Sequence, residues 1–270
     1  MKPAKRVLAV AALTLVSCSS PVVPASTPTT GAVTLRLYAT NATVPLLTDL
    51  TTAYSAFNPT IAFDIVTGGS RLILDQLAEK RDGYGFTTHL PEGGNWLAWP
   101  VAQSGIAVIV NPNLGVAGLS SSELRRIYLG HIGNWKEVGG PDADVVLFSR
   151  EEGSDTRAEF EQQVMGERLT TLSARLAPSS EAMVISVAEE PGSIGYVAMG
   201  YLNEQARALE IDGVALTPQS VSENRYPLRS TVFAVGLDEP EADYRAFLGW
   251  VQSAEGQAVV GIRHAALLRP

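Results

Sequence analysis

From Val33 to the C-terminus, hydrophobic and polar residues follow two alternating patterns. Short apolar or alternating runs, typical of β-strands, are separated by stretches whose apolar residues recur at helical spacing. The strand-like runs are VTLRLYA (33–39), IAFDIVTGG (61–69), GIAVIVNP (105–112), DADVVLFSR (142–150), SIGYVAMGYL (193–202, leading into a helix) and STVFAVG (230–236). The helical runs cover 45–57, 71–80, 121–130, 156–165 and, as one long helix, 244–260. Strands that alternate with helices in this way predict an α/β fold with a parallel sheet.

The first 32 residues follow a different pattern. Three basic residues precede the apolar run VLAVAALTLV, which is too short to span a bilayer as a stable anchor. The sequence LVSC (15–18) then resembles a bacterial lipobox. We expect residues 1–17 to be a lipoprotein signal peptide, Cys18 to be lipidated, and 18–32, rich in Pro, Ser and Thr, to be a tether. The protein would be anchored by its lipid at the extracytoplasmic face of the cell membrane. A signal peptide that is cut further on is the alternative interpretation.

Composition narrows the choice of partners. The formal net charge of the 270 residues is −8, and removal of residues 1–17, which carry three basic and no acidic residues, would leave −11. Such an acidic protein argues against nucleic acid or an anionic membrane surface as a partner. Cys18 is the only cysteine and the three histidines are dispersed, so we expect no disulfide, no metal site and no cofactor. An anionic ligand would have to be attracted by local hydrogen-bond donors.

Three strand-to-helix junctions carry hydroxyl side chains where helices are expected to begin. These residues are Thr43, Ser70, Ser154 and Thr156, the last two a few positions after Arg150. Hydroxyl residues often cap helices, and helix N-termini offer free N–H donors with a partial positive charge. Each junction is therefore either an ordinary cap or part of an oxyanion site built from hydroxyls, N–H groups and one arginine.

Five stretches resemble, in order and spacing, the phosphate-binding protein of bacterial phosphate ABC transporters. They are TGGSRLILDQL, IYLGHIGNWKEVGG, REEGSDTRAEFE, PGSIGYVAMGYL and FLGWVQSAEGQAVV. The resemblance implies a two-lobed, hinged periplasmic-binding-protein fold (type II), each lobe a mainly parallel sheet flanked by helices. Lobe I would comprise 33–105 and 228–270, and lobe II 106–227. Such a protein is a monomer without catalytic activity that captures inorganic phosphate between its lobes and delivers it to an ABC permease.

The resemblance also implies a set of ligand-binding positions. Arg150 would supply a charged fork to the ligand, Glu152 would orient Arg150, and the first-loop pair Thr43 and Val44 would supply a hydroxyl and backbone N–H groups. The full set is Thr43, Val44, Ser70, Thr88, Arg150, Ser154, Asp155 and Thr156, with Glu152 behind Arg150.

Two positions depart from the family pattern. Thr88 stands where the family often has an Asp or Ser that contacts the ligand, and Asp155 where glycine is common. A carboxylate that contacts the ligand accepts the proton of hydrogen phosphate and repels fully ionised sulfate, whereas a threonine repels neither. We expect Asp155 to cap the helix, and a replacement acceptor is the alternative. Thr156 and Glu159 are spaced as a capping box.

Other functions stay open at this point. The chain could bind another tetrahedral oxyanion, such as sulfate, molybdate or tungstate, or it could sense an anion at the cell surface without a transporter. Hydrolysis at Ser154 is disfavoured, because EGSDT lacks the glycine that a nucleophile elbow has two residues after its serine. We therefore expect a binding protein and not an enzyme.

Overall fold

The computed structural model describes residues 33–90 and 93–267, which belong to one compact unit of the chain. The predicted signal peptide, the tether and lipidated Cys18 lie outside these residues. None of the helices in the described ranges combines the length and the apolar character needed to cross a membrane.

The described strands form one large mixed sheet and one small parallel pair. The order in the large sheet is β2-β1-β3-β11-β4-β8-β6-β7, with β9 also paired to β4, and β5 pairs with β10. The strands are β1 Val33–Thr40, β2 Ile61–Gly68, β3 Tyr84–Thr87, β4 Leu97–Val110, β5 Gly118–Leu119, β6 Val146–Arg150, β7 Arg175–Ala177, β8 Ser193–Ala198, β9 Arg207–Ala208, β10 Glu210–Ile211 and β11 Arg229–Gly236.

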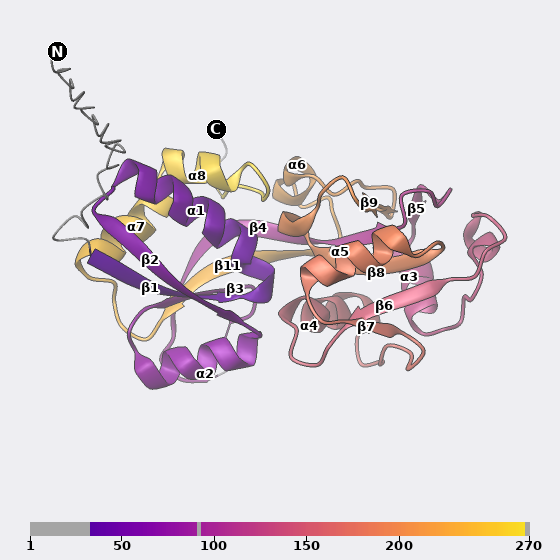
Figure 1. Cartoon of the computed structure of the whole chain (residues 1–270), viewed down its shortest axis with the longest axis horizontal. Helices are drawn as coiled ribbons and strands as arrows, with labels where there is room; N and C mark the ends of the chain where they lie inside the picture. The colour runs from indigo at the N-terminus through magenta and orange to yellow at the C-terminus, as the bar shows by residue number, and fades with distance from the viewer. Residues whose placement is uncertain (1–32, 91–92, 268–270) are drawn as a thin grey trace, which may run out of the picture. The chain divides into compact units, whose positions relative to one another are not determined.

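Helices flank both parts of this sheet (Figure 1). Beside β1 to β3, α1 and α8 lie on one side and α2 on the other. The α-helices are α1 Val44–Phe57, α2 Ser70–Lys80, α3 Ser121–Tyr128, α4 Asp155–Phe160, α5 Ser180–Glu189, α6 Pro218–Ser222, α7 Ala242–Val251 and α8 Ala254–Val260. The short helices of other types are η1 Asn41–Thr43, η2 Trp135–Val138, η3 Glu161–Met165 and η4 Met199–Tyr201.

The long strand β4 runs through both parts of the sheet. It pairs with β11 up to Gly105 and with β8 from Ile106 on, antiparallel in both cases. On either side the pairing is parallel, β2-β1-β3 in one part and β8-β6-β7 in the other. The predicted parallel sheet is therefore present on each side, and the antiparallel strands between make the whole sheet mixed. The sequence pattern predicted only the second part of β4, because Pro100, Gln103 and Ser104 interrupt the apolar run in the first part.

Buried apolar side chains gather in separate clusters on the two sides of β4. We call the part with β1 to β3, β11, α1, α2, α7 and α8 lobe I, and the part with β5 to β10 and α3 to α6 lobe II. The main core of lobe I includes Leu37, Leu47, Phe86 and Phe247, and that of lobe II includes Val108, Trp135, Phe160 and Tyr196. The exact residue boundaries that the sequence suggested for the lobes remain a prediction.

The predicted helix over 244–260 is wrong in one respect, because the structure divides it into α7 and α8. The Ser253 hydroxyl accepts a hydrogen bond from Gly256 N at 3.3 Å and so caps α8. A serine side chain that bonds to the backbone ahead of it favours the start of a new helix over continuation of the old one. The helix predicted after the strand at 193–198 is present only as the short helix η4.

Two motifs of the sequence build the core of lobe II and thereby position β6 and α4. Trp135 is fully buried, and its indole N–H donates to Gly192 O at 2.8 Å. Tyr196 stacks on Phe160, with ring centroids 4.1 Å apart, and its hydroxyl lies 2.9 Å from Ser149 Oγ. Since Ser149 is next to the last residue of β6 and Phe160 is the last of α4, Tyr196 holds these two elements in a fixed relation.

Candidate anion-binding site

Three segments that are far apart in the sequence meet between the lobes. Ala42 N donates to Asp155 Oδ2 at 3.0 Å, which joins η1 of lobe I to α4 of lobe II. A Cβ atom added at Gly69 would lie only 2.6 Å from Gly153 O, so the start of α2 touches the loop before α4. The Tyr201 hydroxyl also donates to Asn41 O at 2.7 Å. The three junctions singled out in the sequence are thus brought together.

The meeting point follows from the direction of the strands. η1 follows β1, α2 follows β2 and α4 follows β6, so each junction lies at the carboxyl end of a strand within a parallel ladder. In open α/β sheets this end is where ligands bind. The sequence order alone therefore places the junctions at one edge of each lobe.

Arg150 is the charged centre of the site and is fully buried. Its Nε and Nη2 atoms each donate to the Glu151 carboxylate at 2.9 Å, and Nη1 donates to Ser180 Oγ at 2.9 Å. A guanidinium has five N–H donors. Among the described residues two of the five, one on each terminal nitrogen, therefore have no partner. They are available to an anion.

Glu151, not Glu152, pairs with Arg150, which corrects the expectation from the sequence. The Glu151 carboxylate binds the guanidinium in a two-pronged ion pair, with a shortest distance of 2.9 Å. Glu152 lies in the turn that leads to α4 and is exposed, and it is not among the hydrogen-bond partners of the guanidinium in the described part of the chain. Ser180, at the start of α5, was not predicted at all, because nothing near Arg150 in the sequence points to it.

A group of buried polar atoms on the segments that meet between the lobes lacks hydrogen-bond partners within the described part of the chain. It comprises the hydroxyl oxygens of Thr40, Thr88 and Thr156 and one carboxylate oxygen, Oδ1, of Asp155. Buried polar groups are nearly always paired, because an unpaired one costs about 1–3 kcal/mol. Four such atoms on the segments that meet between the lobes, together with the free N–H groups of Arg150, are what a site for a small polar anion requires.

The register of the sheet explains why Thr40 and Thr88 belong to this group. Ala39 of β1 pairs with Phe86 of β3, and these two strands are neighbours in the sheet. Thr40 is the last residue of β1 and Thr88 directly follows β3, so both lie at the carboxyl ends of these strands. Thr40 was missed in the sequence. The end of β1, directly before the first junction, is the signal that could have identified it.

Asp155 does not cap a helix, contrary to the prediction. The cap of α4 is Ser154, whose hydroxyl accepts from Arg157 N at 3.3 Å. Asp155 instead reaches across to Ala42 and keeps its second oxygen unpartnered. The predicted capping box of Thr156 and Glu159 is likewise absent from α4, because the helix begins two residues earlier than that box requires.

Glu159 is a further acidic residue of this region, and it is only 5% exposed. Burial raises the pKa of its carboxyl group to about 8, the Asp155 charge adds to this increase, and the hydroxyls of Ser230 and Thr88 act against it. Thr88 faces Glu159 without forming a well-shaped hydrogen bond. Its spacing from Thr156 had predicted only a capping role for Glu159.

The remaining predicted residues lie at the edge of the site. The Thr43 hydroxyl lies 3.0 Å from Thr40 O and 2.9 Å from Phe86 O, so its hydrogen-bond partners in this structure are backbone carbonyl oxygens. Val44 and Ser70 are the first residues of α1 and α2, and both are half-buried. Their positions suit backbone donors more than side-chain donors.

A cavity of about 480 Å³ opens beside the group of unpartnered atoms. It is lined by residues of both lobes, namely Asn41, Gly69, Arg71, Leu72, Asp75, Glu151, Glu152 and Gly153. Because Asn41 and Glu151 border both this cavity and the buried atoms, the cavity is a route by which a small ligand could reach Arg150.

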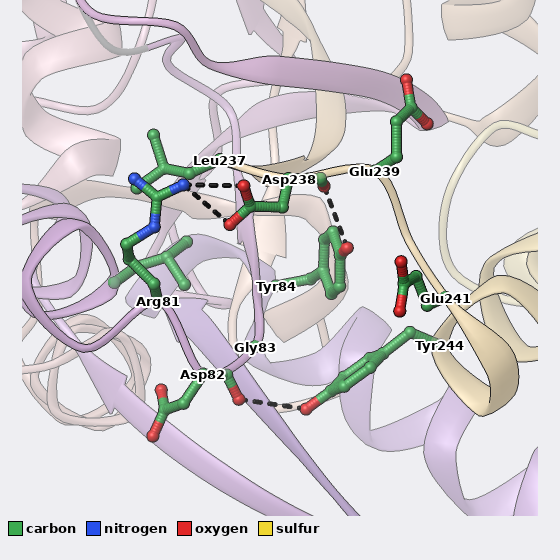
Figure 2. A pocket seen from close by; sticks show the side chains of 10 residues that line it. Arg81, Asp82, Gly83, Tyr84, Leu237, Asp238, Glu239, Glu241 and Tyr244 are labelled. Carbon is green, nitrogen blue, oxygen red and sulfur yellow. Dashed lines mark hydrogen bonds and ion pairs between the residues drawn. The ribbon is translucent and has the colours of Figure 1, made fainter.

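Lobe I carries another cavity of about 470 Å³, shown in Figure 2, that suits an anion poorly. Its only basic residue, Arg81, is bound by Asp238 at 2.7 Å, and the rest of the lining includes three more carboxylates. These carboxylates and burial also raise the pKa of Tyr84 to about 12. Because the only basic residue of this lining is already paired, the cavity between the lobes, where Glu151 adjoins Arg150 and its free donors, is the better candidate for an anion.

Comparison with known proteins shows which family the chain belongs to. The chain matches the family described as PBP superfamily domain over residues 24–255. It is 30% identical to the phosphate-binding protein PstS of Bacillus subtilis over 230 residues, which cover 83% of this chain and 76% of the relative. These relatives are named as binding proteins rather than enzymes, which confirms the expectation that the chain is not an enzyme.

Solved structures show the same fold. A protein of Clostridium perfringens, assigned as a phosphate ABC transporter substrate-binding protein and solved with bound phosphate, has a TM-score of 0.80 at 26% identity, covering 87% of this chain and 100% of that one. A phosphate transport receptor from Vibrio cholerae has a TM-score of 0.67 at 20% identity, covering 84% and 97%. The two-lobed fold predicted from the sequence is confirmed. The chain therefore belongs to the PBP superfamily, in the family of the phosphate-binding proteins of bacterial phosphate ABC transporters.

Proposed function

We propose that this protein is an extracytoplasmic substrate-binding protein that captures inorganic phosphate between its lobes and delivers it to an ABC permease. The observation that carries the proposal is Arg150, a buried guanidinium with two free N–H donors, together with the buried unpartnered hydroxyls of Thr40, Thr88 and Thr156. Charge-assisted hydrogen bonds from arginine suit tetrahedral oxyanions, and hydroxyls supply the remaining donors.

The further ligand contacts follow from the family and from the positions of the junctions. Thr43, Val44 and Ser70 would contribute from lobe I, largely through backbone N–H groups, and Ser154 through its hydroxyl. Asp155 would act as an acceptor for the proton of hydrogen phosphate, since its free oxygen is buried. A ligand held by residues of both lobes stabilises the closed arrangement that a permease recognises.

The proposal is tested by calorimetry of the protein without residues 1–17. Phosphate, sulfate, molybdate and tungstate are titrated separately near neutral pH. We expect phosphate to bind most tightly. Tighter binding of another oxyanion would assign the site to that anion, and no binding of any of them would refute the proposed function. Uptake of phosphate in vesicles that contain a permease would separate transport from sensing.

We also propose that Cys18 carries a lipid anchor, because LVSC follows directly on the apolar run of the signal peptide. Cys18→Ser should move the protein from the membrane fraction to the soluble fraction after cell lysis. A variant that stays in the membrane fraction and is processed like the wild type would contradict this proposal.

A further inference from the structure

Two buried carboxyl groups lie side by side in the anion site. Asp155 and Glu159 are one helical turn apart on α4, so they share a face of that helix. Their exposed fractions are 0% and 5%. Asp155 binds Ala42 of lobe I, and Glu159 faces Thr88 and Ser230, which also belong to lobe I. Both side chains therefore lie between the lobes, next to the unpartnered hydroxyls.

The charges around Glu159 do not neutralise it. Asp155 is the charged group that acts on it directly. Of the elements packed against α4, β6 presents Arg150, which is paired with Glu151, and η3 presents Glu161, which is paired with Arg157. β8 presents Tyr196, whose phenol is uncharged at neutral pH, and burial raises its pKa further, to about 12. An anion bound at Arg150 would add further negative charge beside both carboxyl groups.

We propose that Glu159 is an additional residue of the anion site and must carry a proton for the anion to bind, so that binding is coupled to proton uptake. This inference rests on the proposed function. An ionised Glu159 would place a second buried carboxylate beside a dianion, where low polarity strengthens repulsion. A protonated Glu159 removes that repulsion and offers an O–H donor.

The direction of the pH dependence follows from this requirement. The pKa of Glu159 without ligand is raised to about 8, so the group is mostly protonated at pH 7 and mostly ionised at pH 9. If only the protonated form binds, affinity falls about tenfold between pH 7 and pH 9 from this group alone. The bound anion must in turn raise the pKa further, so that binding near pH 8.5 takes up a substantial fraction of one proton.

The test is calorimetry with inorganic phosphate at several pH values in pairs of buffers with different ionisation enthalpies, which counts the protons taken up. Glu159→Gln keeps the neutral shape of the side chain at every pH. We expect it to match the wild type near pH 6.5, to bind about tenfold more tightly than the wild type at pH 9, and to lose the extra proton uptake. Glu167→Gln, an exposed glutamate in the segment after η3, removes the same charge and should behave as the wild type.

The outcomes are distinct. Identical pH profiles and proton counts in the wild type and Glu159→Gln would overturn the inference while leaving phosphate binding intact. Absence of phosphate binding in the wild type would overturn the proposed function and the inference together. If Glu159→Gln does not fold, as judged by circular dichroism, the wild-type proton count decides alone, and a count explained by the ionisation of phosphate itself would refute the inference.

Discussion

Arg150 concentrates the positive charge of the site in one side chain. Glu151 and Ser180 fix its orientation, and two N–H donors remain for a ligand. Hydrogen bonds to charged groups contribute about 1.5–3 kcal/mol each. Arg150→Ala should therefore weaken phosphate binding by about a hundredfold or more, with the fold intact by circular dichroism. Calorimetry measures the loss, and unchanged affinity would rule out the site.

Arg157 provides a matched control for that experiment. It is a neighbouring arginine whose side chain bonds to Glu161 and to Arg150 O. Arg157→Ala removes the same charge and should alter phosphate affinity far less than Arg150→Ala, because Arg150 is the arginine that supplies donors to the proposed anion.

Asp155 decides the selectivity between phosphate and sulfate. On the sequence alone, a capping Asp155 implied phosphate and sulfate affinities within about tenfold, since hydroxyls adapt to either anion. The structure removes that premise, because Asp155 keeps a buried, unpartnered oxygen at the site. We now expect a phosphate preference above roughly a thousandfold, about 4 kcal/mol.

Asp155→Asn tests this selectivity directly. Its amide oxygen can still accept from Ala42 N, while the free acceptor becomes a donor. The variant should lose phosphate affinity and gain sulfate affinity in competition calorimetry. A wild type that binds both anions equally well would show that the acceptor lies elsewhere.

At the scale of elements, the contact between the start of α2 and the loop before α4 closes the site. Gly69 leaves no room for a Cβ atom, since that atom would lie 2.6 Å from Gly153 O. Overpacking of this kind costs about 1–3 kcal/mol. Gly69→Ala should push the lobes apart and lower phosphate affinity about tenfold, with little change in thermal stability.

Gly115→Ala is the control for this prediction, because nothing lies within 4 Å of its added Cβ atom. Equal phosphate affinity in the two variants would mean that the contact at Gly69 does not contribute to closure. Lower thermal stability of Gly69→Ala without a change in affinity would place the strain inside lobe I.

At the scale of the whole molecule, His264 connects the C-terminal segment to lobe II. It is 1% exposed, and neither ring nitrogen has a partner among the described residues. Its ring packs on Gly200 of η4, and the next residue, Ala265, exchanges two backbone hydrogen bonds with Gln103 of β4. The ring is thus held where the two lobes are joined.

Burial lowers the pKa of His264 to about 4, and the Arg263 charge adds to the effect. The pKa of His264 is lower in the folded than in the unfolded protein, so the unfolded protein takes up a proton below about pH 6.5 while the folded protein does not. The free energy of unfolding is therefore unaffected by this group above about pH 6.5 and decreases as the pH falls toward 4. The loss should approach about 3 kcal/mol of unfolding free energy.

His264→Leu should remove this pH dependence. Urea unfolding at pH 7 and pH 4 measures it, since effects of other groups cancel in the comparison with the wild type. His131→Leu, an exposed histidine, serves as the control. If the wild type and His264→Leu lose equal free energy between the two pH values, His264 is not buried as described.

The sequence by itself predicted the alternation of most of the longer strands and helices, though not β3, β7 or α5, together with the three junctions and Arg150 as the arginine of a candidate site. These are local properties, because apolar periodicity and the residues at helix starts act over a few positions. The family pattern added the two-lobed fold, since its five stretches span both lobes.

Only the tertiary structure decided which groups around Arg150 are paired and which are free. Glu151 rather than Glu152 holds the guanidinium, Asp155 crosses to Ala42 instead of capping α4, and Glu159 lies between the lobes. The Asp155 contact joins segments 113 residues apart, and burial sets the protonation of the Glu159 carboxyl group. Spacing along the chain predicts neither these contacts nor the burial, because both form only after the two lobes have folded around β4.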